Sequence, residues 1–377
     1  MSLPRDFAVY ASIVEPWYES LKDPSRSQAE TLRRLLSIYS KTRYGEKHSP
    51  ETVEGFESFR ERFPIISYRE ISCYLEDVKK GDFRAFLPEP PQCWVMTRGS
   101  TGRQKTIPAT KSHLNDILSC GARALSNYIV RRRSLDITGG RILNLSMPSR
   151  VMGLDAGDNR LVLGYSSGTY SRLFPMLGGA ALAPRQEEID ALGPGMGKAD
   201  WERRFELVYD ETKDENISAA IGVAPVIIAF FRYLKKKHSL LPKDLWEIHA
   251  VFCTSVRKIH FRYAPIFEKY LGKASTIEIY SATEGVYAQQ IDELPYISPN
   301  YDRYLFEVEL GGRVKMLHEL KRGEWGRLIV SSCMFPRYDI GDMVEAMGKN
   351  YFRIFGRANT LHILEHRLYR LLFGWLL

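Results

Sequence analysis

The chain has 377 residues, of which 44% are apolar and 26% are charged, and its formal net charge is +8. This composition is typical of a globular protein with a sizeable core and excludes a largely disordered chain. The basic residues are dispersed, without a zinc finger, basic tail or basic-aromatic motif, so the sequence gives no support for nucleic-acid binding. We predict that the two short basic clusters, 131–133 and 235–237, lie at helix ends, where cations suit the helix dipole.

Cysteine usage and apolar runs indicate the compartment. The five cysteines are widely spaced and form no CxxC pair, so we predict buried free thiols rather than disulfides or a zinc site. The N-terminus lacks an apolar signal region, and the longest apolar run, 223–231, is too short to span a bilayer. The expectation is a cytoplasmic protein with no membrane partner.

The N-terminal region, to about Asp82, is predicted to be helical. Ser27 and Glu30 have the spacing of a capping box. A proline-rich stretch, 87–91, then predicts a loop. The apolar residues on one face of the helix near Ser27 are Ala29, Leu32, Leu35, Leu36 and Tyr39.

From Cys93 onward, short apolar strands alternate with longer helical patterns. This alternation predicts an α/β architecture with a largely parallel sheet. The expected strands are 94–96, 142–147, 248–253 and 276–282, and the expected helices are 114–129, 225–237 and 259–271.

After Tyr304 the pattern becomes β-rich. Residues 304–310 and 314–320 flank Gly311-Gly312 and predict a hairpin. Further strands are expected at 327–333 and 351–355, which together indicate a barrel-like subdomain.

Residues 97–105, Thr-Arg-Gly-Ser-Thr-Gly-Arg-Gln-Lys, follow the first short strand. Glycine permits close backbone approach, N–H groups and hydroxyls can bond phosphate oxygens, and Lys105 adds positive charge. The spacing is not that of a Walker A loop. Taken alone, this motif fits a phosphate-binding loop and a polar surface turn equally well.

Three later motifs are weaker when each is considered alone. Residues 280–285, Tyr-Ser-Ala-Thr-Glu-Gly, follow a strand and could hold a phosphate oxygen and Mg²⁺, although a helix N-cap at Thr283 is the simpler interpretation. Residues 337–342, Arg-Tyr-Asp-Ile-Gly-Asp, could bind ribose hydroxyls through an aspartate at a strand end or form an ordinary turn. Residues 355–359, Phe-Gly-Arg-Ala-Asn, could be a hinge beside a nucleotide or a plain turn.

In their order and spacing, the four motifs resemble those of the acyl-adenylate-forming superfamily, and most closely the auxin-responsive acyl-acid amido synthetase family with its microbial relatives. Residues 63–68, Phe-Pro-Ile-Ile-Ser-Tyr, also resemble this family, as do Tyr74-Leu75, Lys-Gly-Asp at 80–82 and Glu-Gly-Val-Tyr-Ala-Gln at 284–289. The resemblance extends over about 63–367. It implies a large α/β domain of mostly parallel sheets flanked by helices, with a β-rich subdomain at about 304–357.

The resemblance also implies ATP and Mg²⁺ as cofactors, with Thr283, Glu284 and Lys105 as the catalytic residues. The 97–105 loop would hold the β- and γ-phosphates, Thr283 the α-phosphate and Glu284 the Mg²⁺ ion. Tyr280 would lie near the adenine, Asp342 would bind the ribose and Arg357 would approach the nucleotide. The full nucleotide-binding set is Thr97, Gly99, Ser100, Thr101, Gly102, Lys105, Thr254, Ser255, Tyr280, Ser281, Thr283, Asp342 and Arg357.

The acyl group is expected beside the helix that begins at Pro225, with Gly222 before it. Apolar side chains there predict a hydrophobic or aromatic carboxylic acid, unless the same residues belong to the core. These residues are Val223, Ala224, Val226, Ile227, Phe230 and Phe231.

Several positions depart from the family pattern. Arg98 stands where serine is usual, Thr254-Ser255 where a glycine pair touches adenine, Asp339 where arginine is common and Asn359 where the hinge residue is Asp or Lys. In the superfamily a lid domain with a catalytic lysine follows the hinge. We therefore expect 1–357 to form the ATP- and acyl-binding domain and 358–377 a hinge with a lid remnant, so that activity is weak unless a partner protein supplies a lid.

The predicted function is activation of a carboxylic acid by ATP to acyl-AMP and pyrophosphate, followed by amide formation with an amino acid. One alternative is a ligase that passes the acyl group to a thiol of CoA or to a protein. The other is a catalytically impaired ATP- or acyl-binding protein. The nature of the acceptor, an amine or a thiol, distinguishes the first two.

Overall fold

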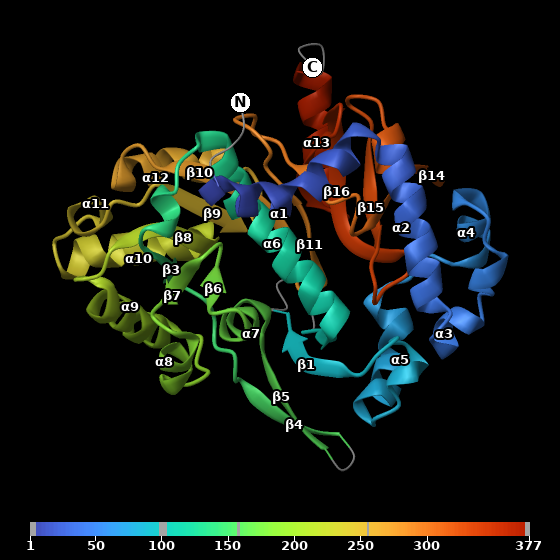
Figure 1. Cartoon of the computed structure of the whole chain (residues 1–377), viewed down its shortest axis with the longest axis horizontal. Helices are drawn as coiled ribbons and strands as arrows, with labels where there is room; N and C mark the ends of the chain where they lie inside the picture. Colours follow the sequence, from blue (N-terminus) through green and yellow to red (C-terminus); the bar gives the residue numbers. More distant parts are fainter. Residues whose placement is uncertain (1–4, 98–103, 157–158, 255, 374–377) are drawn as a thin grey trace. The chain divides into compact units, whose positions relative to one another are not determined.

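The computed structural model describes residues 5–97, 104–156, 159–254 and 256–373 (Figure 1). Its contacts divide the chain into two compact units. Unit 1 comprises residues 1–14, 93–109 and 117–295, and unit 2 comprises residues 15–92, 110–116 and 296–377. Among the described residues, no helix is both long and apolar enough to cross a membrane.

The main sheet of unit 1 is mostly parallel, as the sequence predicted. Within this unit its strand order is β11-β10-β9-β8-β3-β7-β6. Neighbours from β10 to β7 pair in parallel, whereas β11 and β6 add antiparallel edges. The strands are β3 (Arg141–Asn144), β6 (Met176–Leu177), β7 (Ala180–Ala183), β8 (Ile217–Val223), β9 (Ala250–Thr254), β10 (Ser275–Ala282) and β11 (Gly285–Gln289).

A second sheet carries the first motif and has the order β2-β1-β5-β4. Strand β1 pairs in parallel with β5, and β4 and β5 form an antiparallel hairpin. Of these four strands only β1 was predicted. The strands are β1 (Pro91–Met96), β2 (Thr106–Thr110), β4 (Met152–Ala156) and β5 (Asn159–Tyr165).

Helices connect these strands. The predicted helices are present at α6 (Lys111–Arg132), α10 (Ala224–Lys237) and α12 (Ala264–Leu271), the last preceded by a π-helical turn, η4 (Ile259–Tyr263). Both basic clusters lie at the ends of their helices, as predicted. The remaining elements are η3 (Asp136–Thr138), α7 (Ser166–Leu173), α8 (Gln186–Ala191), α9 (Lys198–Thr212) and α11 (Pro242–Leu245).

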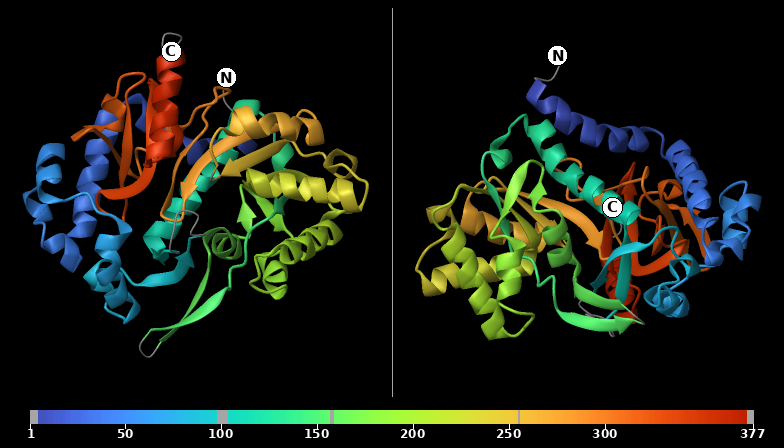
Figure 2. Two further views of the ribbon diagram at one scale, coloured as in Figure 1. Left: turned by 180° about the vertical axis from the view of Figure 1, so that it is seen from behind. Right: turned by 60° about the horizontal axis from the view of Figure 1, so that its bottom comes forward.

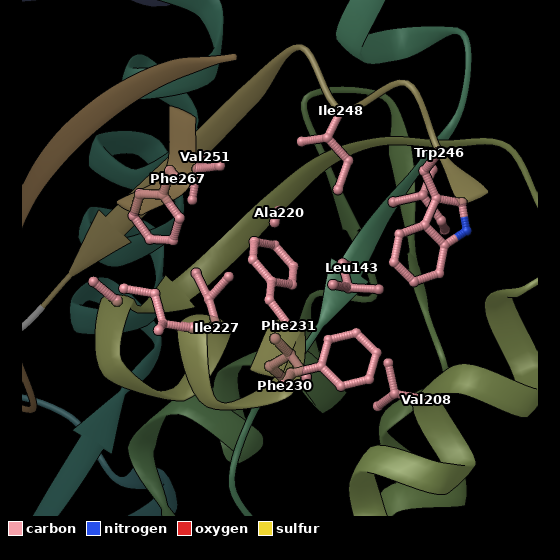
Figure 3. Close-up of a cluster of buried hydrophobic side chains, with 14 of the residues drawn as sticks. Leu143, Val208, Ala220, Ile227, Phe230, Phe231, Trp246, Ile248, Val251 and Phe267 are labelled. Atoms are coloured by element: carbon pink, nitrogen blue, oxygen red, sulfur yellow. The ribbon is translucent and has the colours of Figure 1, made fainter. Parts of the chain in front are cut away.

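The apolar face of α10 forms the core of unit 1 (Figure 3). Phe231 packs edge-on against Phe267, and Phe230 stacks with Trp246. Of the two alternatives for this face, an acyl-pocket wall or the core, the core holds for its buried members, because they fill the interior between α10 and the sheet. Ala224, Ile227, Phe230 and Phe231 have no exposed surface, whereas Gly222, Val223 and Val226 are partly exposed.

Residues 5–85 consist of helices joined by short loops, and a helical region to about Asp82 was predicted. The expected capping box at Ser27 is wrong, because α2 begins earlier: Asp23 is its N-cap and accepts a hydrogen bond from the Arg26 N–H. Pro24 suits the first helical position, so the start moves ahead of Ser27, and Glu30 pairs with Arg26 instead. The elements are α1 (Arg5–Lys22), α2 (Pro24–Tyr39), α3 (Arg43–Glu46), η1 (Pro50–Thr52), α4 (Phe56–Arg62), α5 (Tyr68–Lys79) and η2 (Phe83–Ala85).

The β-rich part of unit 2 is an antiparallel sheet of order β14-β13-β15-β16-β17, whose orange and red strands lie side by side (Figure 2). The predicted hairpin is present, although its second strand ends at Met316 in a short helical turn. Strand β16 of this sheet was not predicted, because Gly341 interrupts the pattern of apolar residues along it. Gly341 has a φ of +80°. The elements are β12 (Ser298–Pro299), β13 (Leu305–Leu310), β14 (Arg313–Met316), η5 (Leu317–Glu319), β15 (Trp325–Ser331), β16 (Tyr338–Gly348), β17 (Tyr351–Arg357) and α13 (Thr360–Phe373).

Buried polar groups stabilise unit 2. The Arg337 guanidinium donates to Glu307 at 2.9 Å and to the carbonyl of Phe63 at 2.7 Å, and both charged side chains are almost fully buried. The arginine of the third motif is therefore a structural residue that ties the sheet to the segment after α4.

Among the cysteines, Cys120, Cys253 and Cys333 are buried as predicted, whereas Cys93 is partly exposed and the expectation was wrong for the exposed Cys73.

Candidate functional site

The ends of the glycine- and hydroxyl-rich motif are joined by two hydrogen bonds. The Thr97 N–H donates to the Lys105 carbonyl, and the Lys105 N–H donates to the Thr97 hydroxyl, each at 3.0 Å. These bonds close the connection between β1 and β2. Predicted residues Gly99, Ser100, Thr101 and Gly102, and the atypical Arg98, lie outside the described residues.

Thr283 and Glu284 form the two-residue connection between antiparallel strands β10 and β11. The alternative interpretation of Thr283 as a helix N-cap is therefore wrong. The connection stands at the carboxyl end of β10, the end at which parallel sheets bind ligands. Both side chains are buried, at 9% and 6% exposure.

Lys105 and Glu284 come together although 179 positions separate them in the chain. The ammonium nitrogen lies 3.7 Å from the Glu284 carboxylate, and Lys105 is a third exposed. The arrangement places a cation beside a carboxylate, and Thr283 precedes that carboxylate in the same two-residue connection, so unit 1 joins the first two motifs as the sequence predicted. Such a set can bind phosphate oxygens and a divalent cation.

Thr254 and Tyr280 lie on neighbouring strands near the same edge. Thr254 ends β9 and pairs with Ile279 of β10. Tyr280 is 7% exposed, and its ring centroid lies 5.4 Å from that of Tyr287. The ladder shifts register between Tyr280 and Ser281, two residues before the Thr283 connection. Ser255, predicted beside Thr254, lies outside the described residues.

Helix α7 contributes two residues that the sequence analysis missed. The Tyr170 hydroxyl donates to the Thr283 carbonyl at 3.1 Å, and the Ser166 hydroxyl lies 3.4 Å from the Thr283 hydroxyl. Desolvation raises the pKa of Tyr170 well above its usual value of 10, with smaller contributions from the charges of Cys93 and Glu284. A contact across 113 positions leaves no local pattern in the sequence.

Asp342 and Arg357 belong to unit 2 and face each other across β16 and β17. The Arg357 Nε lies 3.2 Å from an Asp342 carboxylate oxygen, and Arg357 also donates to the Ile340 carbonyl at 2.7 Å. Asp342 is 9% exposed. The expectation that Asp342 ends a strand was wrong, since β16 continues to Gly348.

The two atypical residues of unit 2 have structural partners. Asp339 accepts hydrogen bonds from the Gly341 N–H and from Arg327, each at 2.8 Å. Asn359 accepts a hydrogen bond from the His362 N–H at 3.0 Å, at the start of α13. These contacts account for a carboxylate and an amide at these positions.

A separate pocket of unit 1, of about 460 Å³, opens at the amino end of β10, where Ser275 and Thr276 line it. Because a strand rises about 3.3 Å per residue, this end lies roughly 25 Å along β10 from Thr283. The pocket is therefore distinct from the residues joined by the motifs.

The N-terminal part of the chain is similar in sequence to known proteins. Residues 15–152 match the GH3 family N-terminal domain. A probable indole-3-acetic acid-amido synthetase, GH3.12, from Oryza sativa subsp. japonica is 26% identical over 138 residues, which cover 36% of this chain and 22% of that protein. The jasmonoyl-L-amino acid synthetase JAR4 from Nicotiana attenuata is 22% identical over 151 residues, or 38% of this chain and 26% of that protein. These matches thus span less than a third of each relative.

Solved structures share the fold over most of the chain. The AtGH3.15 acyl acid amido synthetase in complex with 2,4-DB superposes with a TM-score of 0.73 at 14% identity, covering 94% of this chain and 72% of that one. The chain is similar to the GH3 amido synthetases in sequence and in fold. A 2-hydroxyisobutyryl-CoA ligase in complex with 2-HIB-AMP and CoA has a TM-score of 0.56 at 15% identity, covering 94% and 75%. The α/β fold predicted from the motifs is thereby confirmed.

Proposed function

We propose that the protein binds ATP with Mg²⁺, activates a carboxylic acid as its acyl-AMP and transfers the acyl group to an amine. The observation that carries the proposal is the placement of Lys105 3.7 Å from Glu284, beside Thr283, at the carboxyl end of β10. A loop rich in glycine and hydroxyls ends at that lysine. The fold shared with GH3 amido synthetases supports the same activity.

In the first step a carboxylate oxygen of the acid attacks the α-phosphorus of ATP. The bond from this phosphorus to the bridging oxygen of the β-phosphate breaks, and pyrophosphate leaves. Both reactants are anions, so the protein's task is to hold them together and to stabilise negative charge on the phosphoryl oxygens. We assign the Thr283 hydroxyl to the α-phosphate and Lys105 to the outer phosphates.

Glu284 is the residue that would hold Mg²⁺. The ion prefers oxygen ligands, and with nucleotides it is usually bound by one or two carboxylates together with phosphate oxygens. A single buried carboxylate 3.7 Å from the phosphate-directed ammonium of Lys105 fits this pattern. When bound, the ion would neutralise part of the triphosphate charge, and Lys105 would turn from Glu284 to a phosphate oxygen.

In unit 2, we assign Asp342 to the ribose hydroxyls of the nucleotide and Arg357 to orienting it. A buried carboxylate can accept hydrogen bonds from both hydroxyls of a ribose. The Arg357 Nε lies 3.2 Å from the Asp342 carboxylate, and Asp342 is 9% exposed. Charge on the acceptor strengthens such hydrogen bonds.

In the second step an amine nitrogen attacks the acyl carbon, the bond to the AMP oxygen breaks and the amine loses a proton. The amine is proposed because the relatives at sequence level are amido synthetases. A thiol acceptor is the second candidate, since a CoA ligase shares the fold. A protein that only binds ATP or the acid is the third.

A product assay separates these candidates. The purified protein is incubated with Mg·ATP, a panel of carboxylic acids and either an amino acid mixture or CoA, and the products are identified by mass spectrometry. An acyl amide together with AMP supports the proposal, and an acyl thioester would assign the protein to the CoA ligases. ATP binding without AMP release under any of these conditions would reduce the protein to a binder.

A further inference from the structure

Two side chains of helix α7 contact Thr283 in the Thr283–Glu284 connection, one at its backbone carbonyl and the other at its hydroxyl. The Tyr170 hydroxyl donates to the Thr283 carbonyl at 3.1 Å, and the Ser166 hydroxyl reaches the Thr283 hydroxyl at 3.4 Å. The carbonyl of Thr283 and the N–H of Glu284 share one rigid peptide plane. A bond to this carbonyl therefore orients the backbone of both residues and, with it, both side chains.

The helix that supplies these contacts is itself firmly attached to the segment after β3. A Cβ at Gly168 would lie 1.9 Å from the Met147 carbonyl, so only glycine permits the observed approach of α7 to this segment. Arg172, in the last turn of α7, donates from Nε to the Ser149 hydroxyl at 3.0 Å. Helix α7 is thus a fixed support, and Tyr170 extends from it to the connection.

We propose that Tyr170 is a positioning residue for the adenylation reaction, acting through the Thr283 carbonyl to set the direction of the Thr283 hydroxyl and the Glu284 carboxylate. This inference rests on the proposed function, because it gives Thr283 and Glu284 their roles at the α-phosphate and the metal. It adds a residue that lies outside all four motifs. Ser166 supports the same hydroxyl from the first turn of the helix.

Tyr170 can position these groups because the connection that carries them is short. The two residues between antiparallel strands have few conformations, but their central peptide can rotate as a unit if nothing holds it. Desolvation keeps the Tyr170 hydroxyl protonated far above neutral pH, so it remains a donor to the carbonyl at any pH suited to the enzyme. Catalytic groups displaced by as little as 1 Å can lose much of their effect.

The test compares Tyr170→Phe with Tyr10→Phe. Both substitutions remove only a hydroxyl in unit 1, and each hydroxyl donates to a backbone carbonyl, that of Gly178 at 3.3 Å in the case of Tyr10. We expect Tyr170→Phe to lower kcat for acid-dependent ATP–pyrophosphate exchange about three- to tenfold or more, the value of one hydrogen bond. Tyr10→Phe should leave kcat unchanged.

A double-mutant cycle with Thr283→Val separates positioning from a general loss of stability. If Tyr170 acts through Thr283, adding Tyr170→Phe to Thr283→Val should lower kcat less than twofold further, because the group being positioned is already gone. Independent, multiplicative losses in the double variant would overturn the proposal. So would a wild-type kcat in Tyr170→Phe, or an equal loss in Tyr10→Phe.

Calorimetric titration of the same four proteins of the cycle with Mg·ATP distinguishes failure of this inference from failure of the proposed function. If the wild type binds Mg·ATP but does not exchange pyrophosphate, the proposed adenylation activity is refuted. The role of Tyr170 is then decided by whether Tyr170→Phe and Thr283→Val change the Kd of Mg·ATP independently of each other. Additive changes in Kd would then overturn it, and coupled changes would support it. If the wild type binds no Mg·ATP, both fall together.

Discussion

Glu278 predicts an unusual dependence of stability on pH. This residue of β10 is largely buried in unit 1, with its side chain 16% exposed, and burial raises the pKa of its carboxyl from 4.5 to about 7. The facing groups are His260 of η4, whose Nε2 lies 3.8 Å away, and Cys253 of β9. Burial lowers the pKa of His260, so near neutral pH its imidazole supplies no positive charge to an ionised Glu278. Burial raises the pKa of Cys253, whose thiol is neutral there.

The sign of the effect follows from these pKa values. The unfolded chain ionises this carboxyl near pH 4.5, whereas the folded chain holds it protonated up to about pH 7. Its contribution to stability is therefore fully present below pH 4.5 and is lost as the pH rises through 7. At 1.36 kcal/mol per pH unit, the interval from 4.5 to 7 corresponds to about 3 kcal/mol of unfolding free energy.

Glu278→Gln keeps the shape of the side chain and removes its ionisation. Urea unfolding of the wild type and of this variant between pH 4.5 and 8.5 should show the variant gaining about 3 kcal/mol over the wild type across that range. Glu268→Gln, which neutralises an exposed carboxylate on α12, is the control and should follow the wild type. A constant difference between Glu278→Gln and the wild type at all pH values would refute the reasoning.

Three further substitutions test the site and the core of unit 2. Asp342→Ala should raise the Kd of Mg·ATP roughly ten- to a hundredfold, or about 1.5–3 kcal/mol, in calorimetric titration, and an unchanged Kd would count against the ribose role. Arg337→Met should lower the unfolding free energy by about 1.5–3 kcal/mol in urea, because it removes one of the two arginines, Arg337 and Arg60, that each pair with the buried Glu307 at 2.9 Å; the exposed Arg313→Met should not. Lys105→Ala should lower kcat/KM for ATP in pyrophosphate exchange by about 10²–10³, and full activity would exclude its phosphate role.

The sequence predicted the site best where a motif directly follows a recognisable strand. Thr283 follows β10 and the 97–105 motif follows β1, so both motifs stand at the carboxyl ends of strands, where α/β proteins bind ligands, although the two strands belong to different sheets. The contact of Lys105 with Glu284 bears out that expectation within unit 1. The roles assigned to the site residues remain predictions for the experiments above.

The parts that the sequence did not predict depend on contacts between distant positions. Tyr170 lies on a short helix of weak amphipathic pattern, and only the folded chain brings its hydroxyl to the Thr283 carbonyl. The run that includes Phe230 and Phe231 is equally compatible with a pocket wall or with a core, and packing against α12 and the sheet decides for the core. Strand β16 was missed because Gly341 divides it into two short apolar segments.

The central claim, that this protein forms an acyl-adenylate, is tested most directly by exchange of labelled pyrophosphate into ATP in the presence of a panel of carboxylic acids. Glu284→Gln removes the carboxylate proposed for Mg²⁺, and Glu268→Gln removes an exposed one from the same unit. We expect acid-dependent exchange in the wild type and in Glu268→Gln, and a loss of about 10²-fold or more in Glu284→Gln. Two results would contradict the formation of an acyl-adenylate as proposed. One is exchange that is equally fast in Glu284→Gln, and the other is the absence of exchange with every acid of the panel.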